Sequence, residues 1–202
     1  MIKAILFDMD GVLVDAKDWH YNVLNKALEE YGHFISIEDH IKIFDGLSTA
    51  KKLEMLSKER GLDRGLHQEI NDLKQKYTLE VFSQKCHVDL NQIDMLKKLS
   101  SNYKLALCSN SQRKTIEVFL AKSTIKDFFE FYLSNQDVIN AKPDAEIYNK
   151  AIKKLGVKPE ECLIIEDNFN GIRAAKASGA HVLEIGPIAE VNYENIKRKI
   201  KE

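Results

Sequence analysis

The sequence has few cysteines and no long apolar run. Cys86, Cys108 and Cys162 are widely spaced and form no C-x-x-C pair, so the pattern predicts reduced thiols rather than a disulfide framework. No stretch approaches the roughly 18 consecutive apolar residues that cross a bilayer. The apolar run before Asp8 is also shorter than the roughly 7 to 15 residue core of a signal peptide. We therefore expect a cytoplasmic protein with no membrane partner.

The chain also lacks an excess of charge of one sign. Its 30 basic and 31 acidic residues leave a net charge of −1, so the bulk balance indicates no nucleic-acid partner and any anion site has to be local. Hydrophobic residues make up 44% and charged residues 30% of the 202 positions, which argues against disorder. This length suits one compact unit, or a core that carries a modest insertion.

Short strand-like runs alternate with helical patterns along most of the chain. Several runs are continuously apolar, as in strands that helices cover on both faces of a parallel sheet. The pattern predicts an α/β fold with a Rossmann-like parallel sheet. The expected strands cover residues 4–7, 105–108, 131–133, 163–165 and 182–185.

About ninety residues between the first two expected strands contain only helical patterns. Their apolar positions indicate three helices, of which two end near Gly32 and Gly61. We predict an inserted α-helical cap over residues 16–85 and a core domain formed by residues 1–15 and 86–202. Trp19 lies in the apolar stripe of the first cap helix, and Asp15 is a candidate for capping that helix or fixing the hinge.

Polar residues follow the ends of the expected strands. Asp8 and Asp10 end the first, Ser109 and Asn110 the second, and a loop after the third contains Lys142; Glu166 and Asp167 follow the fourth. Because the carboxyl ends of parallel strands open on one edge of a sheet, these groups should meet in one crevice. Two neighbouring carboxylates require a cation or a raised pKa.

In order and spacing, four motifs resemble those of the haloacid dehalogenase superfamily, in the branch with a helical cap that includes β-phosphoglucomutase and phosphoglycolate phosphatase. They are FDMDGVLVD, CSNS, the lysine of NAKPDAEIY, and IEDNFNGIRAAKASGA. The resemblance implies a phosphatase that uses Mg²⁺ and acts on a small phosphorylated metabolite such as a sugar phosphate.

The resemblance also implies a role for each motif residue. Asp8 would be the nucleophile that forms an aspartyl phosphate, and Asp10 the general acid and base, which requires a raised pKa. Ser109, Asn110 and Lys142 would bind the phosphoryl group. The metal ligands would be Asp8, Asp10 through its backbone carbonyl, Glu166 and Asp167. Without the resemblance, Ser109 also fits a helix cap, and Glu166 with Asp167 fit acids at a helix start.

Candidate substrate contacts in the cap are His20, Gly46, Ser48 and Thr49. Lys74 and Lys76 could also reach the substrate, although a solvated charged helix face explains them equally. Relatives carry a Pro-Gly turn where this chain has residues 88–91, which leaves the hinge geometry open.

Two other functions remain open at this point. One is a phosphomutase that resembles β-phosphoglucomutase, which the lack of an arginine near Thr49 disfavours. The other is a Mg²⁺-binding, phosphorylatable switch module, which the large insertion after the first strand disfavours. We expect a monomer, with a dimer as the alternative.

Overall fold

The computed structural model describes residues 1–202, and a five-stranded parallel sheet forms its centre. The strands lie in the order β3-β2-β1-β4-β5, and every neighbouring pair is parallel. They are β1 (Ala4–Phe7), β2 (Lys104–Cys108), β3 (Phe131–Leu133), β4 (Cys162–Glu166) and β5 (His181–Glu184). The five expected strands are therefore present, and all of their carboxyl ends lie on one edge of the sheet.

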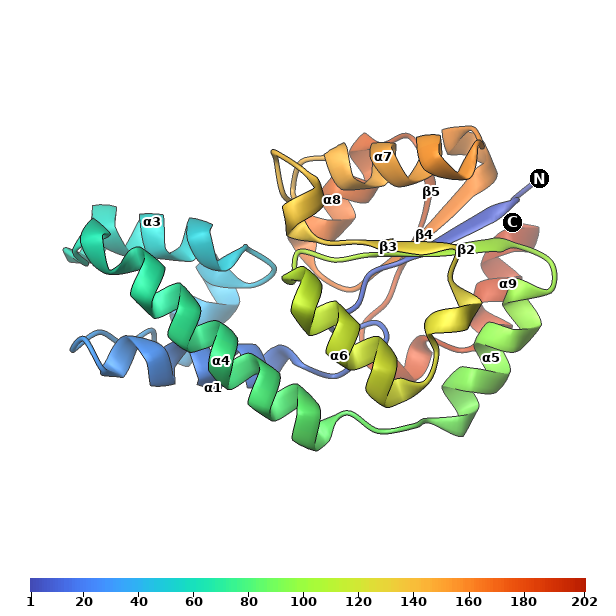
Figure 1. Cartoon of the computed structure of the whole chain (residues 1–202). Helices are drawn as coiled ribbons and strands as arrows, with labels where there is room; N and C mark the ends of the chain where they lie inside the picture. The colour runs from blue at the N-terminus through green and yellow to red at the C-terminus, as the bar shows by residue number, and fades with distance from the viewer.

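Helices cover both faces of this sheet (Figure 1). On one face lie α7 (Glu146–Leu155) and α8 (Phe169–Ala177), and on the other lie α5 (Leu90–Ser100), α6 (Arg113–Ser123) and α9 (Tyr193–Lys201). The central strand β1 is buried along its whole length, which explains its uninterrupted apolar sequence. The α/β fold predicted from the sequence is confirmed, and a helix, α6, follows β2 as the helix-cap interpretation of Ser109 implied, although it begins only at Arg113.

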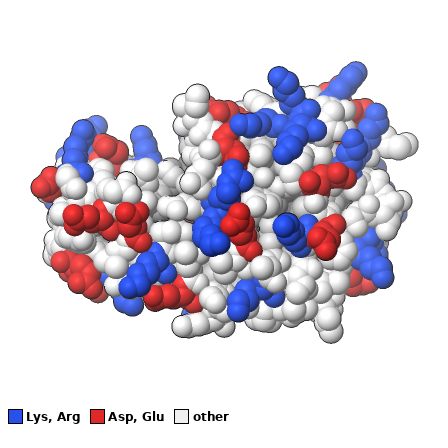
Figure 2. All heavy atoms as spheres, in the orientation of Figure 1, with Lys and Arg blue, Asp and Glu red and all other residues white.

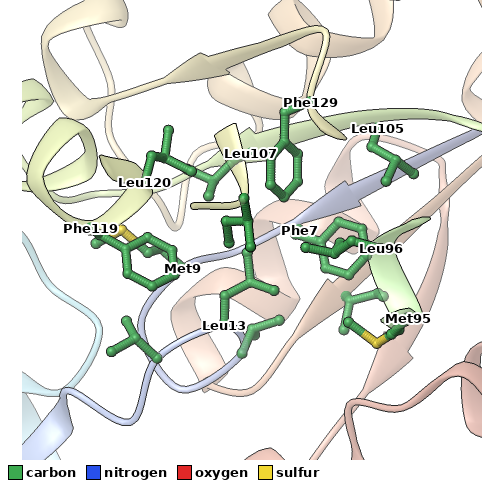
Figure 3. Packing of buried hydrophobic residues seen from close by; sticks show 14 of the residues in the cluster. Phe7, Met9, Leu13, Met95, Leu96, Leu105, Leu107, Phe119, Leu120 and Phe129 are labelled. Carbon is green, nitrogen blue, oxygen red and sulfur yellow. The ribbon is translucent and has the colours of Figure 1, made fainter. Parts of the chain in front are cut away.

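The larger of the two apolar layers contains most of the aromatic residues of the core. Figure 3 shows Phe7, Leu105 and Leu107 of the sheet beside side chains of α5 and α6. Phe7 meets Phe129 edge to face, with ring centroids 6.0 Å apart. Burying this layer fixes the end of β1, and with it the position of Asp8.

The insertion consists of helices, with α1 (Lys17–Glu29), α3 (Thr49–Arg60) and α4 (His67–Lys85) as its main elements. They bury an apolar cluster of their own that includes Leu24, Leu53 and Ile70. In Figure 1 they stand beside the sheet, at the opposite end from both termini. The expected helical cap is therefore present; its division from the core at residues 16–85 stays a prediction.

The remaining elements are short. They are α2 (Ile37–Asp39), the π-helical turn η1 (His40–Phe44), and the 3₁₀ turns η2 (Arg64–Leu66), η3 (Lys126–Phe128), η4 (Asn135–Asp137), η5 (Pro159–Glu161) and η6 (Ile188–Glu190).

The two chain segments that join cap and core differ in how their helices begin. Asp15 is exposed, and Ala16 precedes α1 without a side-chain hydrogen bond, so the expectation that Asp15 caps this helix is wrong. On the return segment, Asp89 caps α5 by accepting a hydrogen bond of 2.9 Å from the backbone N–H of Asn91. This cap begins the helix within residues 88–91, the segment whose hinge geometry the sequence left open.

The surface and the thiols carry no unusual feature. No helix combines the length and the apolar character needed to cross a membrane. On the face that Figure 2 shows, basic and acidic side chains are interspersed, and the surface is hollowed between the cap and the core. All three cysteines are free and buried.

Candidate active site

Three carboxylates meet at the carboxyl edge of the sheet. Asp8 follows β1, Glu166 is the last residue of β4, and Asp167 comes directly after it. One oxygen from each of the three lies within 4.8 Å of the others. Because β1 and β4 are adjacent parallel strands, their register alone brings these residues together.

Lys142 joins two of these carboxylates. Its side chain is 4% exposed or less, and its ammonium donates to Asp8 Oδ1 at 2.6 Å, to Glu166 Oε1 at 2.7 Å and to the carbonyl of Cys108 at 2.8 Å. Burial alone would lower the pKa of Lys142, but the two carboxylates outweigh it and raise that pKa above its ordinary value. All three N–H donors are thus engaged within the protein.

Glu166 is fully buried and fixed from several sides. Its Oε1 accepts from Lys142 and from the Tyr148 hydroxyl, and its Oε2 accepts from the backbone N–H of Asp167 at 3.3 Å. A Cβ on Gly171 would lie 2.0 Å from Oε1, so only glycine fits beside this carboxylate. No local signal in the sequence points to Tyr148, because it lies in the apolar stripe of α7.

The three carboxylates suit a hard divalent cation. Burial, followed by the charge of Glu166, raises the pKa of Asp8 well above its ordinary value, and only Lys142 opposes this effect. Oδ2 of Asp167 is buried and accepts no well-directed hydrogen bond, although the Lys17 ammonium lies 2.7 Å away. Carboxylate oxygens of this kind are the ligands that Mg²⁺ prefers. The residues present therefore fit a magnesium site.

Asp10 has different neighbours from those expected. Its Oδ1 lies 2.9 Å from His20 Nε2, and its Oδ2 accepts from the Ser111 hydroxyl at 2.8 Å. Burial would raise the pKa of Asp10, but the charge and hydrogen bond of His20, with Ser111 and Lys74, lower it overall. The expected rise in the pKa of Asp10 is therefore wrong for the protein without substrate, because its close partners are donors rather than acids.

Ser109 and Asn110 lie at the end of β2, beside Asp8. The hydroxyl of Ser109 accepts from the Ser111 N–H at 3.0 Å, and α6 begins after Gln112, so Ser109 is not the cap of that helix. The amide of Asn110 donates at 3.2 Å to the carbonyls of both Gly46 and Lys142, which ties the cap loop to the core.

Several backbone N–H groups around Asp8 have no partner. Met9 and Asp10 follow β1 and Asn110 follows the adjacent β2, and the N–H groups of these three residues donate to no protein acceptor. Because the Asn110 side chain is occupied, its free N–H is the group that it offers to an anion. Unpartnered N–H groups in a turn are suited to bind phosphate oxygens.

A cavity of about 520 Å³ opens above these groups, between cap and core, and Asp8, Asp10, Ser109, Asn110 and Lys142 line it. The predicted cap contacts also line it: His20, Gly46, Ser48 and Thr49. Ser48 in addition caps α3.

The remaining cap candidates separate into two groups. Lys74 faces the cavity, whereas Lys76 is exposed and lies outside it. Trp19 packs edge to face on Phe82, with ring centroids 5.4 Å apart, and does not line the cavity. Its place in the apolar stripe is thus confirmed.

Comparisons with known proteins agree with this architecture. Residues 5–185 match the model of the haloacid dehalogenase-like hydrolase family. The chain is 32% identical over 181 residues to YhcW of Bacillus subtilis, covering 89% of this chain and 81% of the relative. It is 26% identical over 228 residues to a phosphorylated carbohydrates phosphatase of Thermotoga maritima, covering 100% and 99%. The crystal structure of β-phosphoglucomutase from Clostridium difficile superimposes with a TM-score of 0.83 at 24% identity, covering 100% and 98%, which shows the shared fold.

Proposed function

The chain belongs to the haloacid dehalogenase-like hydrolases, and from this premise we propose that it is a Mg²⁺-dependent phosphatase of a small phosphorylated metabolite. The observation that carries the proposal is the buried network in which Lys142 joins Asp8 to Glu166, beside Asp167. In this network Lys142 holds Oδ1 of Asp8, and Asp8 lines the cavity between cap and core. The name of the Thermotoga maritima relative favours a sugar phosphate as the substrate.

In the first step, an oxygen of Asp8 attacks the phosphorus of the ester. The bond between phosphorus and the ester oxygen breaks, and an aspartyl phosphate forms. The free N–H groups of Met9, Asp10 and Asn110 receive the charge that develops on the phosphoryl oxygens. Lys142 keeps Asp8 in place through its hydrogen bond to Oδ1.

Asp10 supplies the proton that the leaving oxygen needs. The pKa of Asp10 is low in the free protein, but the phosphate that enters the cavity adds negative charge and raises it. As its pKa rises, Asp10 takes up a proton from solvent, and it then donates this proton to the leaving oxygen. In the second step it takes a proton from a water molecule, which attacks phosphorus, breaks the bond to Asp8 and releases inorganic phosphate.

Asp8, Glu166, Asp167 and the backbone carbonyl of Asp10 are the groups we propose to hold Mg²⁺. When bound, the ion supplies the positive charge that lets a phosphate approach several carboxylates. The cap excludes bulk water during the transfer, and the bonds from Asn110 to Gly46 and from Asn170 to the carbonyl of Asp45, at 2.8 Å, hold its loop against the core.

The proposal is tested with a panel of sugar phosphates and with p-nitrophenyl phosphate, by measuring released inorganic phosphate. Activity should require Mg²⁺, fall to background with EDTA, and be absent in Asp8→Asn, whereas the exposed variant Lys153→Met should be as active as the wild type. Turnover by Asp8→Asn would overturn the mechanism. Formation of an isomeric sugar phosphate in place of free phosphate would identify a phosphomutase. If no ester is turned over, the phosphatase proposal is wrong and the Mg²⁺-binding, phosphorylatable switch module is favoured.

A further inference from the structure

Tyr148 of α7 is a buried tyrosine whose hydroxyl has a single partner, a carboxylate of the site. Its side chain is fully buried and belongs to the same apolar cluster as Leu6 of β1 and Ile164 of β4. A phenylalanine would make these apolar contacts equally well, because it has the same ring. The hydroxyl donates to Oε1 of Glu166, so this hydrogen bond is what a tyrosine adds at this position.

Oε1 of Glu166 has no lone pair left for another ligand. An ionised carboxylate oxygen has about two lone pairs that accept hydrogen bonds. On Oε1 the ammonium of Lys142, at 2.7 Å, takes one of them and the Tyr148 hydroxyl takes the other. The same ammonium lies 4.7 Å from the centroid of the Tyr148 ring, so the two donors also hold each other in place.

Oε2 of the same carboxylate is held more loosely. It accepts from the backbone N–H of Asp167 at 3.3 Å and from the Asn168 amide at 3.4 Å. Both distances exceed the usual N–H···O range of about 2.7–3.2 Å. The carboxylate also lies against Gly171, where an added Cβ would be 2.0 Å from Oε1, so α8 limits how far it can turn. Glu166 therefore presents one available oxygen, Oε2, to a cation.

The number of oxygens that a carboxylate offers separates Mg²⁺ from Ca²⁺. Mg²⁺ takes about six oxygen ligands at short distances and keeps several waters, whereas Ca²⁺ takes roughly six to eight and often binds both oxygens of one carboxylate. We propose that Tyr148 is a positioning residue for the metal site: with Lys142 it occupies Oε1, so that Glu166 offers a cation only one oxygen and the site disfavours Ca²⁺. The inference rests on the Mg²⁺ site of the proposed function, but not on the hydrolysis of any ester.

The test compares ion selectivity in the wild type and in Tyr148→Phe, by isothermal titration calorimetry of the metal-free proteins with MgCl₂ and with CaCl₂. We expect the ratio of the Kd for Ca²⁺ to the Kd for Mg²⁺ to fall roughly threefold to tenfold in the variant, the range that one hydrogen bond covers. A general loss of packing, followed by circular dichroism, would weaken the binding of both ions alike and leave this ratio unchanged.

The matched control is Tyr132→Phe, which also removes a tyrosine hydroxyl from a glutamate. The Tyr132 hydroxyl donates to Glu117 at 3.2 Å, and the guanidinium of Arg113 lies 5.9 Å from the centroid of its ring. These three residues lie outside the cavity, so the control should keep the wild-type ratio.

A double-mutant cycle shows whether Tyr148 acts through Glu166. In Glu166→Gln the carboxylate is absent, so adding Tyr148→Phe should leave the ratio of the two Kd values unchanged. A wild-type ratio in Tyr148→Phe, or an equal fall in both backgrounds, would overturn the inference even if esters are hydrolysed. A wild type that binds neither ion would overturn it together with the metal site. If the ratio falls as expected but no ester is hydrolysed, the phosphatase proposal fails and the role of Tyr148 stands.

Discussion

Removing the ammonium of Lys142 tests the buried charge network directly. Lys142→Met keeps the length of the side chain but leaves Asp8, Glu166 and the Cys108 carbonyl without the donor that now lies 2.6–2.8 Å away. Breaking a buried ion pair by removing one partner costs about 3–5 kcal/mol. For a chain of this size, a loss of that order lowers the melting temperature by roughly 6–20 °C.

Urea denaturation followed by circular dichroism, in EDTA, measures this loss without compensation from a divalent cation. The control variant Lys153→Met replaces an exposed lysine of α7, the helix that follows the loop of Lys142, and should change the free energy of unfolding by less than about 0.5 kcal/mol. Adding Glu166→Gln to Lys142→Met should recover about 1 kcal/mol or more, because it removes one of the two uncompensated charges. A loss below about 1 kcal/mol for Lys142→Met would refute the reasoning that these groups are buried and mutually dependent.

Three further changes test other parts of the site. Lys17→Met removes the ammonium that competes for Asp167, so calorimetry should show Mg²⁺ binding roughly threefold to fivefold tighter, as for a half-exposed ion pair; weaker binding would contradict this. Gly171→Ala places a methyl group against Glu166 and should cost about 1–3 kcal/mol in urea denaturation and reduce kcat; wild-type values for both would be incompatible with the packing. Asp89→Ala removes a helix cap and should cost about 1 kcal/mol with unchanged KM; no loss of stability would argue against the cap.

The sheet could be predicted because its strands are short, buried runs of apolar residues. Ala4 to Phe7 has no polar position, and such a run in an α/β pattern is typical of a central parallel strand. Once the strands are known, the parallel arrangement brings Asp8, Glu166 and Asp167 to one edge. A helix after the second strand was likewise expected, and Ile116, Phe119 and Leu120 of α6 recur at helical spacing.

The environment of Asp10 could not be predicted from its neighbours in sequence. Its pKa depends on His20, which belongs to α1, and on Ser111, which follows β2. Both contacts arise from packing between segments that are distant in the chain, and no local pattern encodes them.

The side-chain amide of Asn110 contacts both the cap loop and the core loop that carries Lys142, but it holds the core loop with more hydrogen bonds. Its NH₂ donates to the carbonyl of Gly46 in the cap and to the carbonyl of Lys142 in the core, and its Oδ1 accepts from the backbone N–H of Lys142 at 3.1 Å. Of these bonds, only the one from Asn110 to Gly46 would break if the cap moved away from the core. The loop that carries Lys142 would stay bound to Asn110. A cap movement of this kind would free one N–H of the Asn110 amide and would leave both of its bonds to Lys142 in place.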